Sequence, residues 1–568
     1  MDSPATEGPA ATRAPGLASA LDEFFDWYYR TYPVNATFIG IHNYDHRLPD
    51  FSEHGAGDAL AALDALRARF RQLPAEPLTD AERLDRNLVE RSLDIQVWES
   101  GSRHFHRGNP CVYTGEAVFG VMALLLRPFA PLEVRVEAAV ARMMAIPALL
   151  AQGRANVRRA PAAWTARALR ECAGALAFLE RGIDIFIRDE GVGSPDLQRA
   201  VGAAAAAFRD FQIHLSTELS ANASDDYACG AEALDMLLRS GHFLGMNSAS
   251  VLAFGQEHLA AAETRLREAA APLGIADWRD GLRKLADLHP PASSYYARFT
   301  EVWRDARSAA EAHGLVTWPD YPIRYVPQPP WAREAAPYLY FLFYRAPAAF
   351  DHLPVVDYLV TPVDPDMAPE EQHRRLRATN ESVIKLNHVI HHGGLGHHIQ
   401  NWHAYYRAAS RIGQIAAVDC ANRIALFCGG TMAEGWACYA TDLMDAIGFL
   451  TPLERLSHAQ TRVRMAARAI ADVQLHTGAW TLEETVTFYR DRAGMPDDSA
   501  RAEAVKNSMF PGVALTYLCG TELIHDLRRE MQAHQPGFEL RRFHDRLLSY
   551  GSVPVALIAA EMRREDSD

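Results

Sequence analysis

The stretch TDAERLDRNLVERSLDIQVW, residues 79–98, carries the pattern that decides the fold class. Thr79 and Glu82 match the capping box S/T-x-x-E, in which two side chains satisfy the first backbone N–H groups of a helix. The apolar residues that follow recur at the spacing of one helix face: Leu84, Leu88, Ile95 and Trp98. A capped and amphipathic segment of this kind predicts a helix that begins at residue 80.

The same pattern recurs along the chain. Near the start, Leu21, Phe24 and Tyr28 share a helix face, and Pro33 is expected to end that helix. Long runs rich in Ala, Leu and Arg repeat the theme over residues 133–158, 161–187, 195–220, 249–271 and 296–313. We therefore predict an all-α protein built as one large helical fold.

One region departs from this pattern. Between residues 316 and 369 prolines alternate with runs that favour strands, such as residues 323–326 and 355–360, which predicts a small β element. We place a soft boundary at this point. The expected organisation is a disordered tail (1–16), a helical N-terminal subdomain (17–315) and a C-terminal subdomain (316–568) that holds the metal site, all within one large catalytic unit.

Composition excludes several functions. The 568 residues are 49% hydrophobic and 23% charged, as in soluble globular proteins. Because 71 acidic residues outnumber 57 basic ones, no basic field exists for nucleic acid, which we do not expect as a partner. The sequence contains no phosphate-binding loop, dinucleotide fingerprint or serine nucleophile elbow.

Targeting signals are also missing. The first residues do not form a secretory signal, and the most apolar stretch, residues 119–126, is too short to cross a membrane. Seven cysteines without a C-x-x-C pair are typical of reduced thiols. We expect a cytoplasmic protein with no membrane partner, while its oligomeric state cannot be read from the sequence.

The most unusual segment of the sequence is HVIHHGGLGHHIQ, residues 388–400, which has five histidines within eleven positions. Imidazoles that converge with a carboxylate form metal sites for Zn²⁺ or Fe²⁺. On a regular helix His397 would lie about 120° from His391, but the three glycines between the histidine pairs permit a bulge that brings them together. Spacing alone does not choose between His397 and His398 as the ligand.

A second motif, GGTMAEGWACY, occupies residues 429–439. Thr431 and Glu434 again match a capping box, so Glu434 has two interpretations of equal weight: a residue of the helix cap or the carboxylate ligand of the metal. In either case we expect a helix from this motif to about Gly448.

These residues resemble a bacterial family, domain of unknown function 885, of the zincin group. HHGGLGHHIQ (391–400) is similar to its H-E-x-x-P-G-H-H-x-Q box, and EGWA (434–437) to its E-G-W-A box. Other family boxes match at Pro33 to Gly40, at Arg468, Asp472 and His476, and at Pro511, Gly512, Tyr517 and Gly520. The resemblance implies a helical fold with a central channel, like that of oligopeptidases and angiotensin-converting enzyme, and zinc bound by His391, His397 and Glu434.

The chain departs from the family box at the position of the catalytic glutamate, which is His392. A zinc hydrolase needs a group that accepts and returns a proton. His392 is a candidate for this base, or for an additional metal ligand, as is His398. The replacement brings ordinary peptidase activity into question.

Two downstream residues complete the candidate site. By resemblance, His476 and Tyr517 point into the channel and donate hydrogen bonds to an oxyanion on the substrate. Arg468 and Asp472 lie four residues apart, which predicts an ion pair along one helix face.

Three functions remain. We favour a zinc-dependent hydrolase that cleaves an amide or related acyl bond in a peptide or small molecule. The alternatives are a lyase or oxygenase with iron, and a non-catalytic descendant that binds metal or ligand.

Overall fold

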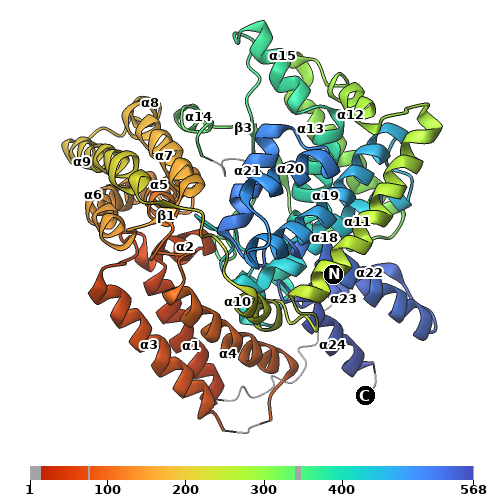
Figure 1. Ribbon diagram of the computed structural model, residues 1–568, viewed down its shortest axis with the longest axis horizontal. Helices are drawn as coiled ribbons and strands as arrows, with labels where there is room; N and C mark the ends of the chain where they lie inside the picture. Colours follow the sequence, from red (N-terminus) through yellow and green to blue (C-terminus); the bar gives the residue numbers. More distant parts are fainter. Residues whose placement is uncertain (1–14, 75–76, 340–346, 567–568) are drawn as a thin grey trace, which may run out of the picture.

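A computed structural model describes residues 15–74, 77–339 and 347–566. Helices dominate this part of the chain, so the predicted all-α fold is confirmed (Figure 1). The tail predicted over residues 1–16 lies, up to residue 14, outside the described residues, and helix α1 begins at Pro15. None of the described helices is both long enough and apolar enough to cross a membrane.

The first half of the chain forms the helices drawn from red to yellow-green in Figure 1. The bounds are α1 (Pro15–Thr31), α2 (Pro33–Ile39), η1 (His42–Tyr44), α3 (Glu53–Arg71), α4 (Asp80–Gly101), α5 (Pro110–Leu126), α6 (Leu132–Asn156), α7 (Ala162–Ala177), η2 (Phe178–Gly182), α8 (Ile183–Glu190), α9 (Pro195–His214), η3 (Leu215–Leu219), α10 (Ala231–Met236), η4 (Leu237–Gly241), α11 (Ser248–Ala270), η5 (Ala271–Leu273), α12 (Trp278–Ala286), η6 (Ala292–Ser294) and α13 (Tyr295–Ala312).

The second half continues with helices drawn from green to blue. They are α14 (Pro330–Arg333), α15 (Pro369–Ala378), η7 (Val383–Gly393), α16 (His397–Arg407), α17 (Arg411–Ile415), η8 (Phe427–Gly429), α18 (Gly430–Ala446), α19 (Pro452–His476), α20 (Leu482–Ala493), α21 (Asp497–Met509), α22 (Thr516–His534), α23 (Leu540–Ser549) and α24 (Val555–Glu565).

The local signals behave as predicted. Thr79 caps α4, since its hydroxyl accepts from the Glu82 N–H (3.3 Å) while the Glu82 carboxylate accepts from the Thr79 N–H (2.9 Å). Helix α1 ends before Pro33, which starts α2 as its first residue. All seven cysteines are free, and six of them are buried.

The predicted β element consists of β3 (Ile323–Pro327) and β4 (Val356–Val360), paired in parallel with Ile323 opposite Val356. A second, minimal parallel pair joins β1 (Ala160–Pro161) to β2 (Ala223–Ser224).

Two apolar clusters hold the helices together. The larger runs from Leu17 to Met562, and the smaller joins α11 to α18, α19 and the helices that follow. Helix α11 packs along α19. These two helices lie on opposite sides of the predicted boundary near residue 315 in the sequence, and they pack against each other in the structure.

Candidate metal centre

The glycine turn, residues 393–396, begins at the last residue of the π-helix η7 and leads into α16. Two of these positions have no room for a side chain. A Cβ on Gly396 would lie 2.0 Å from the carbonyl oxygen of His391, and one on Gly393 would lie 2.2 Å from the hydroxyl of Tyr325. Only residues without side chains let the chain fold back this closely.

Hydrogen bonds from other elements fix the glycine turn. Within the turn, the Gly396 N–H donates to the Ile390 carbonyl at 2.8 Å. The indole N–H of Trp303 donates to the Gly393 carbonyl (2.9 Å), and that of Trp436 donates to the Leu395 carbonyl (2.8 Å). These bonds satisfy carbonyls that the break in the helix leaves without helical partners.

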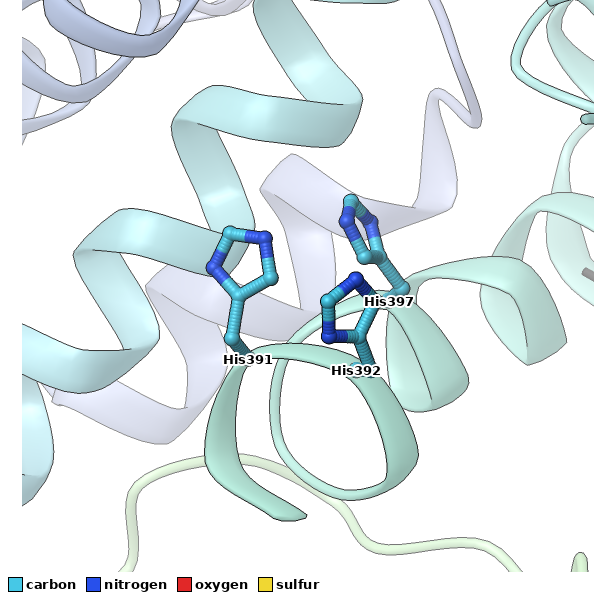
Figure 2. Close-up of side chains that lie close together, drawn as sticks. All are labelled: His391, His392 and His397. Atoms are coloured by element: carbon cyan, nitrogen blue, oxygen red, sulfur yellow. The ribbon is translucent and has the colours of Figure 1, made fainter. Parts of the chain in front are cut away.

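The turn brings three imidazoles together. His391 and His392 end η7, His397 begins α16, and the three rings project to the same side of the turn (Figure 2). One nitrogen from each ring lies within 4.8 Å of the others. The ring centres of His391 and His397 are 4.8 Å apart. The bulge expected from the glycines therefore places His397 beside His391.

His392 is oriented by its own helix. Its Nδ1 lies 2.7 Å from the carbonyl of Asn387, five residues earlier, as the π-helical backbone allows. A carbonyl only accepts, so Nδ1 carries the hydrogen and Nε2 is the basic nitrogen of the ring. Burial lowers the pKa of His392 well below its usual value, and the neighbouring His391 and His397 lower it further.

Glu434 reaches the cluster from α18. Its Oε2 lies 3.4 Å from Nε2 of His391 and 3.6 Å from Nε2 of His397. The capping-box interpretation of this residue is wrong, because α18 already begins at Gly430 and the Thr431 hydroxyl accepts from the backbone N–H of Val555. Glu434 is therefore one turn inside the helix and its carboxylate is available to the histidines.

Charge and burial act in opposite directions on Glu434. Burial raises the pKa of its carboxyl, but the nearby rings of His391 and His397 outweigh burial and hold the pKa well below the usual value. Burial also lowers the pKa of His391, against the effect of the Glu434 carboxylate. Metal ligation requires an ionised carboxylate and a neutral imidazole, and the directions of the pKa shifts of Glu434 and His391 agree with that requirement.

The donor set fits a divalent metal. Oε2 of Glu434 is buried and has no hydrogen-bond partner, which is costly for a carboxylate oxygen unless a cation completes its surroundings. Three imidazole nitrogens and one carboxylate oxygen are ligands typical of zinc and iron.

His398 is not brought to this cluster. Neighbouring residues on a helix point about 100° apart, so the turn that aims His397 inward aims His398 elsewhere. Its Nε2 lies 2.7 Å from the carbonyl of Tyr321, and its ring stacks on that tyrosine at 4.6 Å. His398 is fully buried and structural in its contacts.

Tyr517 and His476 are placed differently from each other. Tyr517 lines the same cavity as the histidines, and burial, together with the negative charge of Glu434, raises the pKa of its hydroxyl well above the usual value. His476 lies outside this lining: its Nε2 lies 2.8 Å from the Asn507 carbonyl and its ring packs against His104. The predicted role of His476 as an oxyanion donor is not supported by this placement, because its ring is fully buried among protein groups.

The predicted ion pair between Arg468 and Asp472 is wrong. Arg468 instead binds Glu503 of α21 through two hydrogen bonds of 2.7 and 3.1 Å. Asp472 accepts the backbone N–H groups of Gly512 and Leu515 at 2.9 and 3.0 Å. Both partners come from other elements that pack against α19, and these outcompete the neighbour on the same helix.

A large cavity of about 2430 Å³ opens beside the cluster. The four candidate ligands line it together with Tyr358, Tyr517 and one face each of α19 and α21. The side chains of His391 and His397 are 16% and 13% exposed, so the ligand atoms face this space rather than the protein interior. Ligand pockets for small molecules are typically about 300–1,000 Å³, so this space admits a longer substrate.

Several contributors were not found by sequence reasoning. Trp303 and Trp436 hold the turn, and the hydroxyl of Tyr358 lies 2.7 Å from Nδ1 of His388. Each lies at least thirty residues from its partner. A single sequence carries no signal for such pairs, although Trp436 belongs to the E-G-W-A box.

Comparisons with known proteins identify the family and the fold of the chain. The sequence model of a family described as bacterial proteins of unknown function (DUF885) matches residues 33–562. No curated protein matches the chain.

Two solved structures share the fold. A candidate lipoprotein of unknown function from Shewanella oneidensis is 22% identical with a TM-score of 0.76, and the match covers 98% of this chain and 100% of that one. A candidate lipoprotein from Colwellia psychrerythraea is 15% identical with a TM-score of 0.77, over 97% and 100%. At these identities the likeness shows the fold alone. Because the family match spans nearly the whole chain, the protein belongs to the DUF885 family of bacterial proteins.

Proposed function

We propose that the protein is a metal-dependent hydrolase, with zinc as the metal, that cleaves an amide or related acyl bond in a peptide or small molecule. One observation carries the proposal. Three imidazole nitrogens lie within 4.8 Å of one another, beside a buried carboxylate oxygen of Glu434 that lacks a hydrogen-bond partner. The size of the adjoining cavity supports a peptide-like substrate.

In this proposal His391, His397 and Glu434 hold the ion, and His392 contributes a further nitrogen. When bound, zinc supplies a Lewis acid and a water of lowered pKa. His392 lies within the same nitrogen cluster and is therefore either a fourth ligand or the base, and only the second role leaves zinc a position for water. The Asn387 carbonyl holds its ring by Nδ1 and thereby keeps Nε2 as the lone-pair nitrogen.

Tyr517 is assigned to stabilise negative charge. Its hydroxyl stays protonated at neutral pH because burial and the nearby Glu434 raise its pKa. A protonated phenol donates one hydrogen bond, to the Glu434 carboxylate at rest or to an oxyanion on the substrate during reaction.

The adjacent histidines provide a matched test. His397→Ala removes a cluster nitrogen and is expected to lower zinc affinity by about 100-fold or more, since losing even a residue that only supports a ligand costs about tenfold to 100-fold. His398→Ala removes a ring bonded to the Tyr321 carbonyl and should lower stability while leaving zinc stoichiometry at one. Metal analysis and thermal unfolding of both variants measure this. Equal zinc binding by both would refute the metal centre.

A lyase or oxygenase that uses iron is the second candidate, and the third imidazole favours it. Nitrogen-rich sites with one carboxylate also suit Fe²⁺. Elemental analysis with assays in the absence of oxygen decides: zinc with oxygen-independent turnover of an acylated peptide supports hydrolysis, whereas iron with oxygen consumption supports the alternative.

His392→Glu restores the glutamate of the family box and tests whether the natural metal site lacks catalytic activity. Peptidase activity that appears only in this variant would identify the natural protein as a non-catalytic metal binder.

A further inference from the structure

A second cavity lies among the helices of the first half of the chain. Its volume is about 100 Å³, whereas the cavity beside the histidines has about 2430 Å³. Residues of α1, α3, α4 and α5 line the smaller cavity, together with residues 422–423 and 509–510. None of the candidate metal ligands belongs to this lining. The proposed function therefore makes no use of the smaller cavity.

The wall of the smaller cavity is mainly apolar. Its aromatic members include Trp27, Tyr32, Phe51, Phe105 and Phe510. The faces of such rings attract cations, because the π-electrons give each face a partial negative charge. Arg423 of the same wall makes such a contact, since its guanidinium carbon lies 4.7 Å from the centre of the Phe105 ring. The wall therefore suits a ligand that combines an apolar part with a positive charge.

Glu116 of α5 contributes a buried carboxyl group to the lining of the smaller cavity. The residue is 8% exposed, and its Oε1 accepts from Nδ2 of Asn422 at 3.0 Å. Its other oxygen, Oε2, has no hydrogen-bond partner among the residues that the structure describes. Burial raises the pKa of Glu116 from 4.5 to about 7, against the hydrogen bond from Asn422 and the charges of Arg142 and Arg423. A ligand that donates to Oε2 would offset the cost of burying this carboxylate.

The two arginines near Glu116 each have another acid beside them. Arg423 binds Glu99 through two hydrogen bonds, one of them 2.7 Å long. Arg142 lies 3.9 Å from Asp45 and also donates to three backbone carbonyls. Once Glu116 is ionised, these five side chains carry a net charge of −1. The charge around Oε2 of Glu116 therefore favours a cation over an anion.

We propose that the smaller cavity binds a small primary amine, whose ammonium group donates to Oε2 of Glu116 while its short apolar tail lies against the aromatic wall. An engineered apolar cavity of about 150 Å³ holds benzene, so a cavity of about 100 Å³ admits about five non-hydrogen atoms. Isobutylamine has this size. The site is separate from the candidate metal centre, and the inference does not rest on the proposed function.

Calorimetry with the full chain tests this assignment. Isobutylamine is compared with isobutanol, a neutral molecule of the same shape, at about pH 8, where Glu116 is ionised because its pKa is about 7. We expect the amine to bind about tenfold more tightly or better, since charge-assisted hydrogen bonds are stronger than neutral ones. Equal affinities for the amine and the alcohol, or no measurable binding of the amine, would overturn the inference.

Glu116→Gln locates the ammonium group. The variant keeps the size of the side chain and an acceptor for Asn422, but it loses the charge. It should weaken binding of isobutylamine by about tenfold or more and leave binding of isobutanol unchanged.

Asp50→Asn is the matched control. Asp50 lines the same cavity but is exposed, and its Oδ1 already accepts from the backbone N–H of Ser52 at 3.0 Å and from Nε2 of Gln152 at 2.8 Å. Its replacement should leave the affinity for isobutylamine unchanged. Equal losses in Glu116→Gln and Asp50→Asn would refute the assignment to Glu116.

A second variant tests the cavity itself and does not depend on the folding of Glu116→Gln. Ala56→Leu adds three carbon atoms at the wall and should abolish binding of both isobutylamine and isobutanol, while thermal unfolding checks that the variant folds. Persistent binding of the amine in Ala56→Leu would place it elsewhere and overturn the inference.

The measurement is repeated after treatment with a chelator. An unchanged affinity supports a site apart from the candidate metal centre. An affinity that falls when metal is removed would show that the amine binds the metal, which refutes this inference and leaves the hydrolase proposal standing.

Discussion

The histidines on either side of the glycine turn and the residues of helix α19 line the same cavity, but these two regions position their side chains by different means. In the turn, the backbone folds back on itself at glycines close in sequence to His391 and His397, and Trp303 and Trp436 then hold the turn by hydrogen bonds. In α19 the backbone is regular over 25 residues, and the partners of Arg468 and Asp472 come from α21 and from the chain that leads into α22. A bend that nearby glycines permit can be predicted from the sequence, whereas the side-chain contacts of a regular helix depend on the elements that pack against it.

The largest expected effect follows from breaking the turn. In Gly396→Ala the new Cβ would lie 2.0 Å from the His391 carbonyl oxygen and 2.8 Å from the Ile390 carbonyl oxygen, both of them backbone atoms. The turn must open, which separates His397 from His391. We expect loss of zinc binding and a decrease in stability of about 3 kcal/mol or more, since backbone strain adds to lost packing. Metal analysis and denaturant unfolding measure both effects.

Gly57→Ala is the control for this substitution. Gly57 is exposed in α3, and a Cβ there would meet nothing within 4 Å. Its replacement should stabilise the protein by about 0.5–1 kcal/mol, because alanine favours helix more than glycine does. A Gly396→Ala variant that still binds zinc would show that the turn does not position the histidines.

An effect of similar size, on stability alone, is expected for Arg468. Its removal in Arg468→Met leaves Glu503 as a buried carboxylate without its main partner, which is expected to cost about 3–5 kcal/mol. A double-mutant cycle with Glu503→Gln should give a coupling energy of about 1 kcal/mol or more. The same cycle with Asp472→Asn should give a value near zero, since no contact joins Arg468 to Asp472. Strong coupling to Asp472 instead would restore the pair predicted along the helix.

A smaller effect depends on pH. Burial raises the pKa of Asp472 from 3.8 to about 7, against the hydrogen bonds it accepts from the backbone. The folded state therefore favours the protonated acid. The stability that comes from this raised pKa is fully present below the ordinary pKa of 3.8, and it is lost as the pH rises through about 7.

Asp472→Asn tests this titration. At pH 5 the variant should be less stable than the natural protein by about 1–3 kcal/mol, because the amide has only one of the two acceptor oxygens of the carboxyl group. The difference should shrink toward pH 8, because the natural protein loses stability there and the uncharged variant does not. Thermal unfolding across this range measures it, and a difference that grows with pH would contradict the assigned direction.

Much of the fold followed from local rules. The capping box at Thr79, the proline stop before α2 and the amphipathic runs each specify a helix without outside help. Within the site, the glycines predicted the bend between the histidine pairs. The roles of His398, His476 and Glu434 could not be assigned in this way, because each depends on which distant group its side chain meets.

The sequence by itself therefore determined a helical protein, its family and a bend that gathers histidines, since backbone conformation responds to residues close in the chain. The tertiary structure decided that His397 rather than His398 joins the cluster, that Glu434 completes it, and that basic side chains from α19 and α21 share its cavity. These results required packing, because hydrogen bonds and charges act over a few ångströms in space and are indifferent to separation along the chain.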